Sequence, residues 1–165
     1  GAAADLASRL GVAFRNGFAI DTATWDPIVF RRGDGSLARH PITEGRYPAE
    51  RIDSVATFWG QALRLTDPGA QGLLAFGAGV VSYEPERAWR FTATTPTFPV
   101  QGWLQAAALT LGRGRVVVLG EAGMLSAQLT GPNRVPAGMN APVAGQNQQF
   151  VLNILHWLSG LGLSH

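Results

Sequence analysis

The stretch LGRGRVVVLGEAGMLSAQ, from Leu111 to Gln128, decides the expected fold. Its residues 115–119 form a short, β-branched and almost wholly apolar run, which is typical of a strand buried on both faces of a sheet. Glycines at positions 112 and 114 predict a tight turn before this run, so residues 103–111 should pair antiparallel with it. We therefore expect a hairpin whose second arm is the central strand of the sheet.

Glu121 follows this predicted strand almost directly, between Gly120 and Gly123. In open α/β sheets, ligands usually bind at the carboxyl ends of the strands. Glu121 is therefore the first candidate for a catalytic or binding side chain. Ser126 is a weaker candidate for a nucleophile, because the Gly-x-Ser-x-Gly elbow is absent from this stretch.

The segments GRGRVVVLGEAGM and QNQQFVLNILHWLSG resemble the C-terminal part of glutamine-amidotransferase-like domains. The similar proteins are bacterial envelope proteins and auxiliary subunits of gliding-motility-type ABC transporters, and GAAADLASRLGVAF, HPITEG and GQAL are similar to the same group. The resemblance implies a class I, flavodoxin-like α/β fold. That fold has three layers, with a mostly parallel sheet, one antiparallel hairpin and flanking helices. The resemblance also implies a periplasmic or cell-envelope location, with the cytoplasm as the alternative.

A length of 165 residues suits a single domain over residues 1–165 with a substantial core. The chain begins at Gly1 and enters a predicted helix at once. In the similar proteins, strands precede this helix, so the resemblance implies that N-terminal strands are missing. The chain is then either a fragment of a longer protein or a subunit that covers its open sheet edge with a second copy. Because an exposed sheet edge favours aggregation, we expect a homodimer.

The composition excludes several functions. The chain has no cysteine, so the Cys-His-Glu triad of working glutamine amidotransferases cannot form. It has no lysine, which rules out a Walker A motif, and residues 77–79 lack the glycine spacing of a dinucleotide site. The arginines are scattered rather than gathered into a stripe for phosphates, and no apolar run reaches the roughly 18 residues of a membrane span. We expect no cofactor, no metal, no nucleic acid and no membrane span.

Residues 31–45, RRGDGSLARHPITEG, predict a polar loop that contains Asp34, His40 and Glu44. A His-Pro-Ile/Val-Thr segment recurs in the similar families, so the resemblance implies that this loop lies near the ligand edge. His40 has two possible roles. Imidazole suits proton transfer near neutral pH, but His40 could equally hold the loop in shape through hydrogen bonds to the backbone.

Residues 129–145 predict a long loop, because three prolines and Gly138 interrupt any regular pattern. Loops longer than about 12 residues are often lids. This loop, with Asn133, Arg134, Met139 and Asn140, is expected either to cover a pocket floored by Glu121 or only to cover the core. Four aromatic residues likewise either line a sugar-binding surface or belong to the core: Trp59, Trp89, Phe91 and Trp103.

The remaining elements follow from periodicity. Helices are predicted over residues 2–10 and 148–158, with Gln149, Asn153 and His156 on the solvated side of the second. Strands are predicted over residues 12–14, 52–65 and 73–76, and irregular structure over 18–30 and 84–99. His165 falls in a terminal tail without an expected role.

Two functions are compatible with these patterns. The first is a non-catalytic module of the bacterial envelope that binds a small molecule or glycan, with Asn140, Arg134 and Glu44 as binding residues. The second is a metal-independent hydrolase of glycoside or ester type. In it, Glu121 would work with His40 or Asp34 as acid and base, if the fold brings the groups within about 5 to 10 Å of each other.

Overall fold

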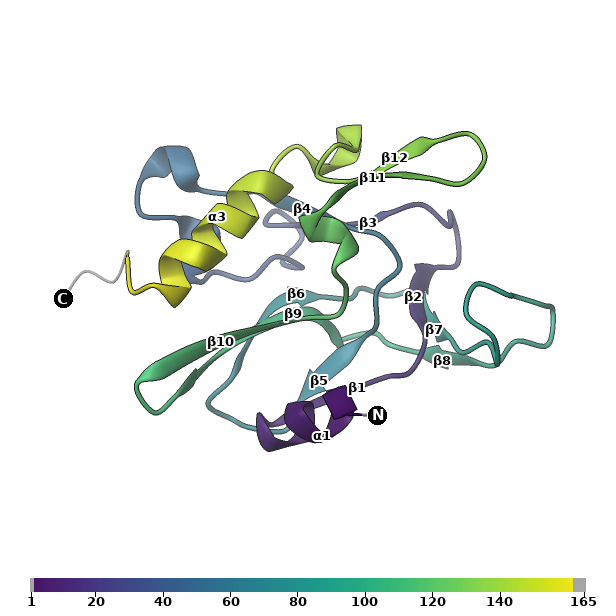
Figure 1. Ribbon diagram of the computed structural model, residues 1–165, viewed down its shortest axis with the longest axis horizontal. Coiled ribbons are helices and arrows are strands. Elements are labelled where there is room, and N and C mark those ends of the chain that lie inside the picture. The colour runs from purple at the N-terminus through teal and green to yellow at the C-terminus, as the bar shows by residue number, and fades with distance from the viewer. Residues whose placement is uncertain (1, 162–165) are drawn as a thin grey trace.

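The longest strand, β9 (Leu104–Leu111), is the centre of the main sheet in the computed structural model, which describes residues 2–161. β10 (Gly114–Leu119) and β6 (Gln71–Ala75) both pair with β9, and β5 (Leu63–Leu65) pairs with it at Leu104. β1 (Val12–Phe14) pairs with β5 (Figure 1). The predicted hairpin is confirmed. The predicted central place of its second arm is wrong, because β10 lies at the end of the strand order and is only partly buried.

Three smaller sheets surround this one. The first contains β2 (Phe18–Asp21), β7 (Val80–Tyr83) and β8 (Thr97–Pro99). The second pairs β3 (Ile28–Arg31) with β4 (Ser54–Thr57), and the third pairs β11 (Ala127–Thr130) with β12 (Val135–Gly138). The helical elements are α1 (Ala2–Arg9), α2 (Pro41–Glu44), α3 (Asn147–Leu158) and the 3₁₀ turns η1 (Pro48–Glu50), η2 (Gly123–Leu125) and η3 (Pro142–Ala144). The predicted tail at His165 lies outside the described residues.

Every strand pair within residues 2–161 is antiparallel, so the predicted α/β fold with a mostly parallel sheet is wrong. Parallel neighbours need a crossover of a dozen or more residues, usually a helix. Here α1 precedes all the strands and α3 follows them, while α2 has only four residues. The prediction that N-terminal strands are missing stays a prediction.

Local predictions failed where strands pair with distant segments. Residues 18–30 contain β2 and β3 although they show no clear period, because β2 pairs with β7 and β3 pairs with β4. Residues 52–65 form two strands, β4 and β5, instead of one. The predicted loop at 129–145 contains most of the β11–β12 hairpin, with Pro136 in a strand that pairs on one side only. The short strand at 12–14 and both long helices are confirmed.

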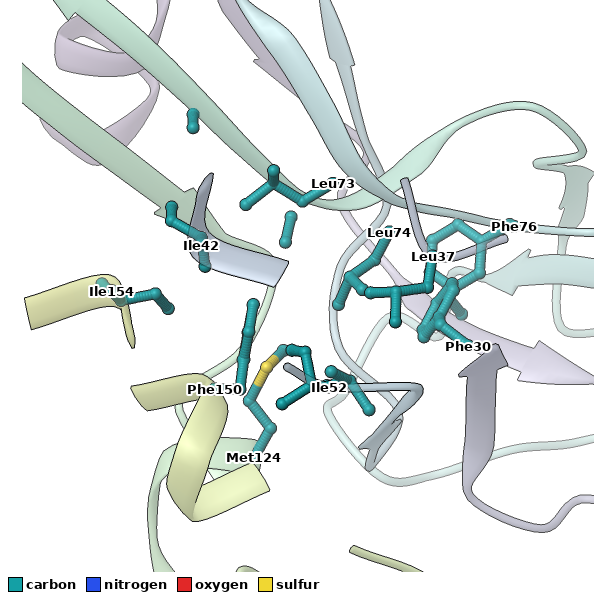
Figure 2. Packing of buried hydrophobic residues seen from close by; sticks show 14 of the residues in the cluster. Phe30, Leu37, Ile42, Ile52, Leu73, Leu74, Phe76, Met124, Phe150 and Ile154 are labelled. Carbon is teal, nitrogen blue, oxygen red and sulfur yellow. The ribbon is translucent and has the colours of Figure 1, made fainter. Parts of the chain in front are cut away.

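The alanines of β9 separate two apolar cores. Ala106 and Ala108 belong to the main core, and Ala107 belongs to a smaller core beneath α1. Small side chains let elements on both faces approach the strand closely. Figure 2 shows the main core, where large side chains from β3, β6, η2, α3 and the connecting segments meet. Its labelled members are Phe30, Leu37, Ile42, Ile52, Leu73, Leu74, Phe76, Met124, Phe150 and Ile154.

Two buried asparagines attach α3 to this core. Asn147 Nδ2 donates to the carbonyl oxygens of Ala56 and Met124, and its Oδ1 accepts from the N–H of Ala56 at 2.9 Å. Asn153 Nδ2 donates to the carbonyl oxygens of Ile42 and Glu50, both at 2.8 Å. The predicted solvated position of Asn153 is therefore wrong. Buried amides are stable only when such partners satisfy them, and periodicity alone does not reveal those partners.

Candidate functional site

Glu121 lies where three segments meet. Gly120 follows β10, donates its N–H to the carbonyl of Gln105 and accepts from the N–H of Gln61, both at 2.8 Å. Gln61 belongs to the break between β4 and β5. The N–H of Phe58, at the start of the same break, donates to Glu121 Oε1 at 2.7 Å. The carboxyl group is thus held between the end of β10 and residues 58–62.

Two glycines allow this close approach. A Cβ atom on Gly120 would lie 2.0 Å from the carbonyl oxygen of Gln61 and 2.3 Å from Gln105 Nε2. A Cβ atom on Gly60 would lie 2.4 Å from Gln105 Nε2 and 2.7 Å from Glu121 Cβ. No side chain fits at either position, because such contacts are shorter than van der Waals distances. The backbone itself therefore forms the wall beside Glu121.

The electrostatic setting of Glu121 is unusual for a carboxyl group. Burial raises its pKa to about 7, although the backbone N–H groups of Phe58 and Met124 act in the opposite direction. Desolvation disfavours the charged form more than these dipoles favour it. Near neutral pH, Glu121 is therefore present in both forms and can either donate or accept a hydrogen bond.

Glu121 opens into a pocket of about 680 Å³, called here the polar pocket. Its side-chain hydrogen-bonding groups come mainly from Asn16, Gln61, Glu86 and Gln128, in addition to Glu121. The remaining lining is glycine backbone, apolar side chains and Thr130. The residues are Asn16, Gly17, Phe18, Phe58, Trp59, Gly60, Gln61, Pro85, Glu86, Ala88, Trp89, Gly120, Glu121, Gly123, Gln128, Thr130 and Ala137.

A second pocket, of about 620 Å³, adjoins the first and is called here the apolar pocket. Both are lined by Phe58, Trp59, Trp89, Thr130 and Ala137, so they lie side by side, and we call the two together the groove. The apolar pocket adds residues from the β2–β3 connection and from the β11–β12 hairpin: Pro27, Gly131, Pro132, Asn133, Val135 and Pro136. In Figure 1 this connection, the hairpin and the β7–β8 connection all project at the same end of the molecule.

Six aromatic side chains pack together beside the groove, and we call them the aromatic cluster: Phe18, Trp25, Trp59, Tyr83, Trp89 and Phe91. Trp59 contacts two other tryptophans of the cluster, with ring centroids 6.3 Å from Trp25 and 6.0 Å from Trp89. Trp89 is 59% exposed and Trp25 is 38% exposed. The cluster therefore presents indole surface to solvent as well as to the groove.

The three tryptophans of this cluster have left-handed backbone conformations. Their φ angles are 59° at Trp25, 63° at Trp59 and 67° at Trp89. Positive φ costs a residue with a Cβ roughly 1–2 kcal/mol and is rare for bulky side chains. Packing among the rings must hold these backbones in place, and strain of this kind concentrates at functional sites.

The structure separates Glu121 from the other predicted catalytic residues, because His40 and Asp34 do not line the groove. His40 caps α2: its Nδ1 accepts from the N–H of Ile42 at 3.1 Å, and its ring packs edge-on against Trp157. Burial lowers the pKa of His40 to about 4. Asp34 accepts from the hydroxyl and N–H of Ser36, and these bonds lower the pKa of its carboxyl group.

The predicted binding residues also lie outside the lining of the groove. Glu44 forms ion pairs with Arg32 and Arg39. Arg134 is in the β11–β12 turn with φ 51°. Asn140 Nδ2 donates to the carbonyl of Gln128 at 3.0 Å, so it supports a residue of the polar pocket without lining it.

The predicted loop at residues 129–145 and the predicted aromatic surface both contribute to the groove in part. The segment after residue 128 does lie beside the pocket of Glu121, but as a hairpin rather than as a loop. Of the predicted aromatic surface, Trp59 and Trp89 line the groove, whereas Trp103 packs with Phe98. Sequence reasoning missed Gln61, Glu86 and Gln128. Their only signal is a polar side chain next to a turn or strand end, which is too common to be specific.

The comparisons with known proteins add no assignment: no protein-family model, curated protein or solved structure matches the chain. The resemblance to glutamine-amidotransferase-like domains stays untested, although the fold it implied is wrong. Within residues 2–161, no helix has the length and apolar character needed to cross a bilayer. The same residues contain no group of three or more His, Cys, Asp or Glu side chains placed to hold a metal ion.

Proposed function

We propose that this protein is a non-catalytic module that binds a neutral glycan in the groove beside Glu121. The observation that carries the proposal is the combination of exposed indole rings with amide and carboxyl groups in one groove. Sugar rings present C–H groups on their faces and hydroxyl groups at their edges. Indole faces pack well against the C–H groups. Side-chain amides, which both donate and accept hydrogen bonds, suit the hydroxyl groups.

The charge of the groove supports a neutral ligand. Its lining includes the carboxyl groups of Glu86 and Glu121 and no arginine. Phosphate and carboxylate ligands are usually bound by arginine, lysine or a helix N-terminus. A sugar hydroxyl, in contrast, can donate to Glu121 when that group is ionised and accept from it when it is protonated. The raised pKa of Glu121 therefore allows binding on both sides of neutral pH.

The bacterial envelope remains the proposed location, and only the sequence resemblance supports it. The homodimer through an open sheet edge also remains a proposal. Among the described residues, β10 pairs only with β9, so its outer edge has no strand partner. Such an edge can accept a strand from a second copy.

Binding should be measured by isothermal titration calorimetry with cello-, chito- and malto-oligosaccharides. We expect saturable binding of at least one series. Trp89→Ala should weaken this binding about tenfold or more, since loss of a tryptophan contact that the ligand buries typically costs over 1 kcal/mol. Tyr47→Ala is the matched control, because Tyr47 is 65% exposed and lies outside the groove lining. Absence of binding to every series, or equal losses in both variants, would contradict the proposal.

A second function, a glycoside or ester hydrolase, is favoured by one observation. A carboxyl group with a pKa of about 7 suits a general acid at neutral pH. Glu86 lines the same pocket and supplies a second carboxyl group, in place of the predicted partners His40 and Asp34. Chromogenic glycosides and esters test this alternative. Turnover that disappears in both Glu121→Gln and Glu86→Gln, with folding intact, would establish the hydrolase and overturn the non-catalytic module.

A further inference from the structure

The apolar pocket has a composition that a glycan alone does not explain. Its lining contains two tryptophans, three prolines, a phenylalanine and a valine, and its polar side chains are only Thr130 and Asn133. No charged side chain lines it. Val135 is 56% exposed on the hairpin although it is apolar. Apolar surface of this extent in a concave site is typical of a place where an apolar group is bound.

The polar and apolar pockets are direct neighbours. Trp59 and Trp89 line both, as do Phe58 on the β4–β5 break and Thr130 and Ala137 on the hairpin. A ligand whose head occupies the polar pocket therefore has the apolar pocket on the other side of the residues that the two pockets share. The groove changes along its course from hydrogen-bonding groups at Glu121, Gln61 and Gln128 to purely apolar contacts at Val135 and Pro136.

We propose that the natural ligand is a neutral amphiphile. Its hydroxylated head group occupies the polar pocket, and an aliphatic chain attached to that head occupies the apolar pocket. This inference rests on the proposed function, because it assigns the head to the glycan site. The absence of arginine from the lining argues against an anionic head, which sets a glycoside-type amphiphile apart from a fatty acid or a phospholipid.

The experiment uses alkyl glycosides as probes, each below its critical micelle concentration. Methyl, hexyl and octyl derivatives of glucose, N-acetylglucosamine and maltose are titrated calorimetrically into the full chain. Each methylene group that leaves water should strengthen binding by up to about fourfold, so octyl derivatives should bind far more tightly than methyl derivatives. Hexanol and octanol serve as chains without a head, and they should bind much more weakly than the matching glycosides.

Two variants on the β11–β12 hairpin test whether the aliphatic chain of the ligand lies in the apolar pocket. Val135→Asn places an amide in the apolar pocket and should abolish most of the gain in affinity from the methyl to the octyl glycoside. Leu129→Asn is the matched control. Leu129 is 50% exposed, alternates with Gln128 and Thr130 along β11, and lines neither pocket. It should leave the whole series unchanged.

The outcomes separate the two proposals. Equal affinities for methyl and octyl derivatives, or equal effects of Val135→Asn and Leu129→Asn, would overturn the amphiphile while leaving the glycan site in place. Octanol that binds as tightly as the octyl glycosides would overturn the head-group assignment and with it the proposed function. No binding by any probe or oligosaccharide would overturn both.

Discussion

The backbone N–H of Phe58 donates to the carboxyl oxygen Oε1 of Glu121 at 2.7 Å, across 63 positions of sequence. This bond connects the break between β4 and β5 to the second residue after the end of β10. It fixes the carboxyl group at one end of the groove and places Trp59, the next residue in the break, at the junction of the two pockets. The candidate site therefore depends on a contact between two irregular segments.

Replacing Glu121 with glutamine should change the pH dependence of stability. The pKa of Glu121 is raised from 4.5 to about 7, so the folded state retains a proton that the unfolded state releases between these values. The wild type should therefore lose up to about 3 kcal/mol relative to Glu121→Gln as the pH rises from about 4.5 to above 7. Urea unfolding of both proteins at pH 4, 6 and 8 measures the difference. A difference that does not vary with pH would contradict the raised pKa.

His40 should make stability pH-dependent in the opposite direction. Burial lowers its pKa from 6.5 to about 4, so its contribution to stability is complete above pH 6.5 and is lost as the pH falls toward 4. His40→Asn keeps a cap for α2 but does not titrate. Between pH 7 and pH 4 the wild type should lose about 2–3 kcal/mol more than this variant. If both proteins lose the same stability between pH 7 and pH 4, the lowered pKa of His40 is contradicted.

Because the backbone at Trp89 is left-handed, glycine should be a better replacement than alanine at this position, which reverses the usual order. Trp89→Gly should be as stable as Trp89→Ala or more stable by up to about 1 kcal/mol, because alanine retains the Cβ that strains φ 67°. At Trp103, which is not among the positive-φ residues, alanine should be the more stable replacement. Thermal unfolding of the four variants tests this. The same order at both positions would contradict a strained Trp89.

Adding one methyl group at Gly120 should damage both the fold and the site. Its Cβ would meet the backbone oxygen of Gln61 at 2.0 Å, and backbone cannot move aside as a side-chain tip can. We expect Gly120→Ala to cost more than about 3 kcal/mol. Gly77→Ala is the control, since no atom lies within 4 Å of its added Cβ and the change should be nearly neutral. Denaturant unfolding measures both, and a neutral Gly120→Ala would contradict this packing of the β10 end.

The elements that the sequence predicted correctly are those with strong local signals. α1, α3 and β1 have their period within their own residues, and Gly112 and Gly114, in and directly after the turn, favour a hairpin. Glu121 was a candidate because it follows an apolar strand, and it lines a pocket in the structure; its role stays a prediction. The sequence alone shows that this chain has no cysteine to serve as a nucleophile.

Sheet order and site composition were decided only by tertiary structure. An apolar run such as residues 115–119 is the same whether it lies at the centre or at the edge of a sheet, because strand partners are supplied by distant segments. β9, rich in alanine, has low intrinsic strand preference, yet it is the centre because small side chains fit between two cores. Distant segments also decide the surroundings of the site residues. They make His40 a helix cap, and they place Trp59 and Gln128 in the lining of the groove. Burial and pairing depend on what packs against a residue, which the residue's own neighbours in sequence do not specify.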